Sequence, residues 1–173
     1  MSAIASAPGA LRAFVISIVA RLPLTMLSIG LLVHARHLTG SFAAAGVVTG
    51  AYAVSLGVGG PLLGKLVDRR GQTLVLVASA GVAAALLVAV AVLPTGTSAA
   101  VLIALACAIG LASPPSGACV RTLFPALLGD AAAVRSAYAA DASASELTWI
   151  AGPPLALGLG ATWSTGAALA AAG

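Results

Sequence analysis

The chain has 173 residues, of which 61% are apolar and 7% are charged, and its net charge is +4. An average soluble domain has roughly 45–50% apolar and about 25% charged residues, so this composition excludes a water-soluble globular fold. The eight Lys and Arg residues are scattered among apolar segments and form neither a basic stripe nor an aromatic platform, which excludes a nucleic-acid partner. The composition instead predicts a lipid bilayer as the surroundings of the chain.

Five apolar stretches are long enough to cross a hydrocarbon layer of about 30 Å, which takes about 20 helical residues. In chain order they cover residues 13–34, 42–63, 73–93, 98–122 and 144–163. A sixth apolar run starts at about residue 165 and is incomplete at residue 173. The runs lack the period-2 alternation of membrane strands. We therefore predict one all-α membrane domain over residues 1–173, a bundle of about five transmembrane helices plus the start of a sixth.

The first span contains a basic residue, Arg21, nine residues after Arg12 and hence roughly 14 Å farther along a helix. An arginine near the bilayer midplane costs about 2.5–3.5 kcal/mol on insertion scales. Either Arg21 lines a cavity, where it binds an anionic group or pairs with a carboxylate, or it snorkels or satisfies carbonyls freed by Pro23. His34 and His37 lie near the outer end of this span; no third ligand is in view, so we expect a solvated pair and no metal site.

The connection between the second and third spans reads "GKLVDRRGQT" and holds four of the twelve charged residues. A topology anchor explains its Lys and Arg residues, but it does not explain Asp68. We expect Gly71 to adopt the positive φ of a tight turn. Asp68 can accept hydrogen bonds from the N–H groups at a neighbouring helix N-terminus. The pattern therefore favours a cytoplasmic latch over a simple anchor.

The orientation follows from the basic residues that flank the spans. With the N-terminus in the cytoplasm, six basic residues lie inside and only Arg36 lies outside, as the positive-inside rule requires. The six are Arg12, Lys65, Arg69, Arg70, Arg121 and Arg135. We expect a multi-pass protein of the plasma membrane.

Three further residues are candidates for a translocation cavity or for proton coupling. Tyr52 and Trp149 are mid-helix aromatics suited to a mixed polar and apolar cavity, although helix packing explains them nearly as well. Glu146 is the expected intramembrane partner of Arg21, because a desolvated carboxylate can alternate between protonated and charged forms. Alternatively, Ser143 and Glu146 form a capping box at the start of the fifth helix. We expect Asp141, which precedes it, to be a surface charge near that helix N-terminus.

Small residues and prolines predict how the spans pack and bend. Pro114 and Pro115 should break the fourth span late in its course. Cys107 and Cys119 lie roughly 18 Å apart on a helix, too far for a disulfide. Small residues spaced by four let helices approach closely. These sets are Gly46 with Gly50, Gly60 with Gly64, and Gly152 with Ala156 and Gly160.

The charged connection resembles a known signature. The run Gly64, Leu66, Asp68, Arg69 and Gly71 resembles the loop between helices 2 and 3 of the major facilitator superfamily, written G-x-L-x-D-R-x-G-[RK]-[RK]. Its position after the second span also agrees. The sequence departs from the signature after Gly71, where "QT" replaces the usual basic pair.

A second, partial resemblance lies in the fifth span. Gly152 and Pro153 in "GPP" resemble the helix-5 antiporter motif of the same superfamily, G-x-x-x-G-P-x-x-G-G, but its other glycine positions hold Thr148, Ala156 and Leu157. The similarity covers essentially the whole chain and corresponds to the N-terminal half of a family protein.

The resemblance implies a fold and a function. In this superfamily two six-helix halves rock about a central site to give alternating access, and the signature loop docks on the other half. By resemblance the chain is half of a secondary transporter, a proton-coupled exporter of small organic molecules. It needs no cofactor and is not an enzyme. Its partners are the substrate, protons and a C-terminal or separate half. The alternative is a non-transporting membrane scaffold or assembly subunit.

Overall fold

In a computed structural model, residues 8–172 are described, and they fold into helices joined by short links, with no strand in that range. The helices are α2 (Pro8–Thr39), α3 (Phe42–Arg70), α4 (Gln72–Ala91), α5 (Ala99–Ala112), α6 (Ser116–Leu128), α7 (Ala131–Thr162) and α8 (Thr165–Ala172). The expected all-helical class is confirmed. The expected sixth run corresponds to α8, which begins at Thr165.

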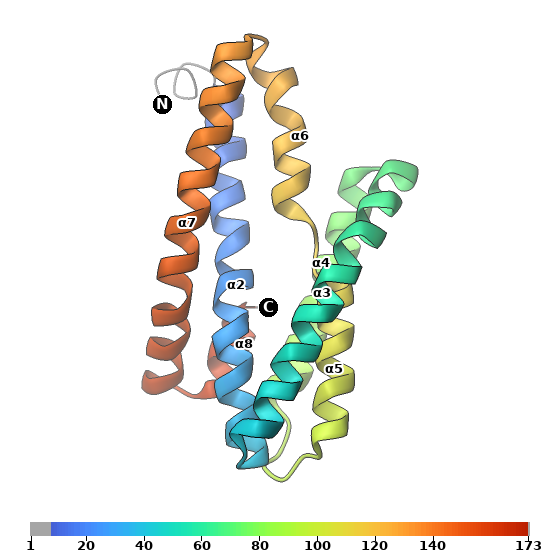
Figure 1. Ribbon diagram of the computed structural model, residues 1–173, viewed down its shortest axis with the longest axis vertical. Coiled ribbons are helices and arrows are strands. Elements are labelled where there is room, and N and C mark those ends of the chain that lie inside the picture. Colours follow the sequence, from blue (N-terminus) through green and yellow to red (C-terminus); the bar gives the residue numbers. More distant parts are fainter. Residues whose placement is uncertain (1–7, 173) are drawn as a thin grey trace.

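Two groups of helices make up the molecule (Figure 1). Helices α2 and α7 lie side by side along the long axis, and α6 packs against both at one end. Helices α3, α4 and α5 form the second group. Helix α2 of the first group contacts α3 and so connects the two groups. The short α8 packs on α2, α4 and α7.

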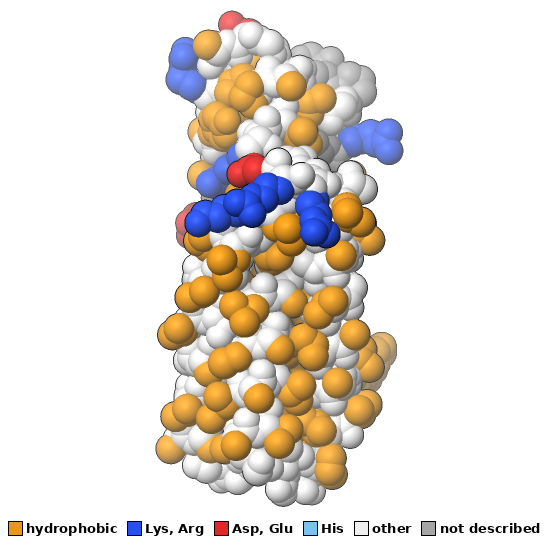
Figure 2. Space-filling model, turned by 90° about the vertical axis from the view of Figure 1, so that its right-hand side faces the viewer, with side chains coloured by type: hydrophobic (Ala, Val, Ile, Leu, Met, Phe, Trp, Pro, Cys, Tyr) orange, Lys and Arg blue, Asp and Glu red, His pale blue; other side chains and the backbone are white. Residues whose placement is uncertain are grey.

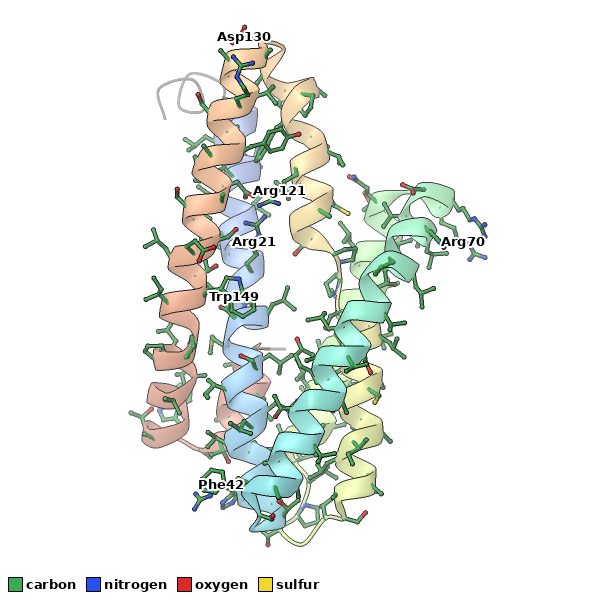
Figure 3. The ribbon with its side chains drawn as sticks, viewed as in Figure 1. Arg21, Phe42, Arg70, Arg121, Asp130 and Trp149 are labelled. Carbon is green, nitrogen blue, oxygen red and sulfur yellow. The ribbon has the colours of Figure 1, made fainter. Side chains whose placement is uncertain are left out.

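The apolar core is concentrated at the end of the molecule that contains Thr39. There α2, α3, α4, α5 and α8 share one cluster of buried side chains, which includes Leu31, Val48, Leu87, Leu102 and Leu169. Toward the other end the core divides. Phe124 and Ala137 join α6 to α7, while Val67, Val75 and Cys119 join α3, α4 and α6. The two helix groups therefore converge at one end and separate toward the end that carries Arg70 (Figure 3).

Four helical segments of the described chain are long and apolar enough to cross a membrane. They are Phe14–Thr39, Phe42–Arg70, Gln72–Ala91 and Ala99–Leu128. On the face drawn in Figure 2, Lys and Arg side chains gather in a band at the level of the α3–α4 turn, and the surface on one side of that band is apolar and uncharged. These features are those of a helical membrane protein.

The fifth expected span, residues 144–163, lies in α7 except for its last residue, and α7 is not among the four apolar segments. Glu146, two prolines and several hydroxyl residues lower its apolar character. The expected count of about five membrane helices is therefore not confirmed.

The expected break at the two prolines is present, because α5 ends at Ala112 and α6 begins at Ser116. Residues 123–143, which separate the fourth and fifth expected spans, are mostly helical: α6 continues to Leu128, and α7 begins at Ala131. Gly129 turns the chain with φ 67°, and Asp130 caps α7 by accepting a hydrogen bond from the Ala133 N–H at 2.8 Å. Glu146 therefore lies well inside α7, and the capping-box interpretation is wrong.

Close helix contacts use other glycines than those expected in α3. A Cβ built on Gly110 of α5 would lie 2.6 Å from the Tyr52 carbonyl oxygen of α3, so only a glycine fits there. The expected pairs in α3 have no such role in the described chain, since a Cβ would meet nothing within 4 Å at Gly46, Gly50, Gly60 and Gly64. Gly152 does fit its expected role, because a Cβ there would collide with Thr25 of α2.

Candidate functional site

A buried carboxylate, Asp141, joins three helices. From α2, Arg21 approaches it with Nη1 at 3.0 Å from Oδ1 and Nη2 at 3.1 Å from Oδ2. From α6, Arg121 donates from Nε to Oδ2 at 2.7 Å. The Asp141 side chain is 0% exposed and that of Arg21 is 12% exposed. Figure 3 shows both arginines between α2 and α6, beside α7.

The partner of Arg21 is therefore Asp141, and the expectation that Asp141 is a surface charge is wrong. A carboxylate buried without partners would cost several kcal/mol, and two guanidinium groups offset that cost. Ser145, one turn farther along α7, donates to the Asp141 carbonyl oxygen at 2.8 Å and accepts a hydrogen bond from Arg21 Nη1. The cluster holds α2, α6 and α7 together at the end where the apolar core divides.

Helical periodicity in α7 is the signal that identifies Asp141. The buried residues of α7 recur every three or four positions, at Ala137, Asp141, Ala144, Thr148, Gly152 and Ala156. This stripe faces α2, so Asp141 belongs to it and Glu146 does not. A fifth helix that starts at residue 144, as the apolar run predicts, excludes Asp141 from any span, so this stripe is not apparent from the sequence.

A cavity of about 370 Å³ adjoins the ion pairs, and we call it the Arg21 cavity. Residues from α2, α3, α6, α7 and the α5–α6 link line it. Its charged lining residues are Arg21 and Arg121. The hydroxyl residues Thr25, Ser113, Ser116, Ser145 and Thr148 also line it. The polar part of the cavity lining therefore consists of hydroxyl groups and two cationic side chains.

The N-terminus of α6 forms part of this wall. Pro115 occupies the N-cap position, and no side chain caps the helix. The Ser116 hydroxyl is buried and has no hydrogen-bond partner. A Cβ built on Gly117 would lie 2.9 Å from Nη2 of Arg21, so the missing side chain leaves room for the guanidinium. Arg21 of α2 therefore lies close to the backbone at the start of α6.

The expected cavity residues are only partly brought together. Trp149 lines the Arg21 cavity and is 55% exposed, so it lies at the opening. Tyr52 is buried in the main core cluster and is not among the lining residues. Glu146 is exposed on α7, and within residues 8–172 it makes no hydrogen bond or ion pair.

The charged connection is mostly helical. Helix α3 continues through Gly64 to Arg70, and Gly71, with the expected positive φ of 87°, is the single residue before α4. Asp68 is exposed and makes no hydrogen bond or ion pair to any described residue. Gln72, which departs from the signature, donates to the Thr122 hydroxyl of α6 at 3.0 Å. A hydrogen bond thus joins the turn to α6, and Asp68 remains exposed.

The two histidines do not form the expected solvated pair. His37 is exposed, but His34 is buried and lies 2.9 Å from the Thr165 hydroxyl and 3.0 Å from the Val90 carbonyl oxygen. His34 therefore joins α2 to α4 and α8. Among residues 8–172, no group of three or more His, Cys, Asp or Glu side chains could hold a metal ion. Cys107 and Cys119 are both free thiols, as expected.

The residues of the helix-5 resemblance also occupy defined places. Gly152 lies against Thr25 where α7 crosses α2. Pro153 and Pro154 are inside α7, and the helix continues through them to Thr162. The contact at Gly152 brings α7 close to α2 just beyond the ion-paired cluster.

The chain matches no protein-family model, no curated protein and no solved structure. The functional interpretation therefore rests on the side chains of the site and on the motifs in the sequence.

Proposed function

We propose that the chain forms one half of a proton-coupled secondary transporter for small organic molecules, of the major facilitator superfamily type. The observation that carries this proposal is a fully buried carboxylate, Asp141, paired with Arg21 and Arg121 beside a cavity among apolar helices. Charged side chains are costly among membrane helices, and where they are retained they usually serve substrate or ion pathways. Export is the direction that the sequence resemblance implies.

The position of the cluster suits a gate. Helix α4 has 20 residues and is therefore about 30 Å long, which matches one hydrocarbon layer. Arg21 lies 18 residues before the end of α2 at Thr39, or roughly 27 Å along the helix. It is therefore close to the level of the α3–α4 turn, nearer the membrane edge than the midplane position expected from Arg12. In our proposal the cluster closes the cytoplasmic end of the cavity.

We assign proton coupling to Asp141 instead of Glu146. Protonation of a carboxylate removes the charge that attracts its partners, so a proton on Asp141 would weaken its bonds to Arg21 and Arg121 together. The three helices that meet at Asp141 could then separate at this end. Asp68 would hold this half against a second six-helix half, by accepting hydrogen bonds from a helix N-terminus of that second half.

The proposal is tested in cells that produce the protein naturally, so that any partner half is present. The native copy is replaced by Arg21→Ala or Asp68→Ala, and the accumulation of fluorescent organic acids, amines and neutral compounds is measured. We expect both variants to change the accumulation of at least one compound about tenfold or more, as deletion of the protein does. Arg135→Ala is the matched control, because Arg135 is exposed on α7 away from the cavity.

If both variants reach the membrane at wild-type levels and every compound accumulates as in unmodified cells, the protein is a scaffold and the transport proposal is wrong. The same conclusion follows if deletion of the protein changes the accumulation of no compound.

A further inference from the structure

We propose that the Arg21 cavity binds a small organic anion, a carboxylate joined to an apolar or aromatic group. The role of this anion as the transported substrate rests on the proposed function, whereas its binding does not. Three features of the cavity support the proposal: the charge of its lining, the open N-terminus of α6 and its apolar lining residues.

The lining charge selects anions. Both arginines line the cavity, whereas none of the four acidic residues of the chain is among its lining residues. Two guanidinium groups against one carboxylate leave the cluster with a formal charge of +1. Such a surface attracts an anion and repels an amine.

Arg121 has N–H groups that form no hydrogen bond within the described chain. It uses Nε to bond Asp141, and its two terminal nitrogens make no hydrogen bond to any described residue. A guanidinium can hold a carboxylate through two parallel N–H···O bonds, which are shorter and stronger than bonds between neutral groups. With a side chain that is 48% exposed, Arg121 is accessible to a ligand that enters the cavity.

The N-terminus of α6 adds a second set of donors. The backbone N–H groups of Gly117 and Ala118 make no hydrogen bond within the described chain, and no side chain caps the helix. The buried Ser116 hydroxyl, which also lines the cavity, has no partner either. Buried polar groups are rarely left unpaired in native structures. A bound carboxylate would satisfy these donors and lie at the positive end of the 13-residue α6 dipole.

The remaining wall is suited to an apolar group. Leu24, Leu56, Pro114 and Trp149 line the cavity with apolar or aromatic surface. The volume of about 370 Å³ falls at the small end of the range of roughly 300–1,000 Å³ for ligand pockets. These dimensions suit a molecule with one ring. The other large cavity, about 420 Å³ between α2 and α4, has no charged lining residue and so offers no anchor for an anion.

The test measures binding directly on the full chain in detergent at neutral pH. The chain has two tryptophans, and Trp163 is away from the cavity, so Trp163→Phe leaves Trp149 as the only indole reporter. Benzoate is titrated, with benzamide and benzylamine as neutral and cationic compounds of the same size. We expect benzoate to change Trp149 emission in a saturable way, and we expect the other two compounds to bind about tenfold more weakly or not at all.

Variants locate the site. Arg121→Gln should weaken benzoate binding about tenfold, and Ser116→Ala, which removes an unpaired hydroxyl and leaves the ion pairs intact, about threefold. Arg135→Gln should have no effect. The proposal is wrong if benzamide binds as tightly as benzoate, or if benzoate binding is unchanged in both Arg121→Gln and Ser116→Ala. If benzoate does not bind but the variants change transport in cells, the proposed anion class is wrong and the proposed function stands. If benzoate binds but the protein transports no compound in cells, the proposed function is wrong and the anion site stands.

Discussion

The stability of the bundle depends at the level of single residues on Asp141. This carboxylate is fully buried, and the Arg21 side chain is nearly buried. The ion pair between them offsets the desolvation cost of both groups. Removing one member of such a pair leaves an uncompensated buried charge. Glu146, only five residues farther along the same helix, is exposed and unpaired within residues 8–172. The two acidic residues of α7 therefore predict opposite outcomes on substitution.

We expect Asp141→Leu to destabilise the protein by about 3–5 kcal/mol, because two arginines lose their shared partner. Glu146→Leu should change the free energy of unfolding by less than about 0.5 kcal/mol, since that side chain is exposed. Denaturant unfolding of the purified variants in detergent, followed by circular dichroism, measures both. Equal destabilisation by the two substitutions would show that Asp141 is not the structural centre of the cluster.

At the scale of helices, α3 and α5 pack so closely that their backbones touch through glycine. Gly59 of α3 lies against the backbone of Gly110 and Leu111, and Gly110 lies against Tyr52 and Leu56. Close backbone approach maximises dispersion contacts, which drive helix association where lipid removes the hydrophobic effect. The expected glycine pairs of α3 lie elsewhere on its surface. Four-residue spacing identifies a small-residue face, but several such faces can exist on one helix.

Gly110→Ala should therefore destabilise the α3–α5 contact by about 1–3 kcal/mol, because the added Cβ would lie 2.6 Å from the Tyr52 carbonyl oxygen. Gly50→Ala is the control, since a Cβ there meets nothing within 4 Å, and the better helix propensity of Ala should stabilise α3 by up to about 1 kcal/mol. Thermal unfolding of both variants in one detergent compares them. A neutral Gly110→Ala would contradict the close packing described here.

For the whole molecule, the important property is the distribution of basic residues along its length. Asp68, Arg69 and Arg70 lie in the last turn of α3, next to the α3–α4 turn, whereas the α4–α5 link around Thr95, at the other end of α4, is uncharged. Basic residues near spans remain on the cytoplasmic side. We therefore propose an orientation in which the turn lies inside the cell and Thr95 lies outside.

Cysteine labelling in intact cells tests this orientation. Cys107→Ala and Cys119→Ala remove the native thiols, and Asp68→Cys or Thr95→Cys then introduces one exposed thiol. We expect an impermeant maleimide to label Thr95→Cys in intact cells and Asp68→Cys only after permeabilisation. The reverse pattern would invert the topology, and the cytoplasmic latch would have to be abandoned.

The all-helical membrane class, the helix break at Pro114 and Pro115 and the turn at Gly71 were all predictable from the order of residues along the chain. They depend on composition, on the length of apolar runs and on backbone restrictions that a residue imposes on its neighbours, and these do not require knowledge of the partner surface. The choice of Asp141 as partner of Arg21, the burial of His34 and the glycines between α3 and α5 were not predictable in this way. Each depends on which face of one helix meets another, and that is set only when the helices pack. The packing of α2 against α7, for example, brings Arg21 and Asp141, 120 positions apart in the chain, within 3.1 Å of each other.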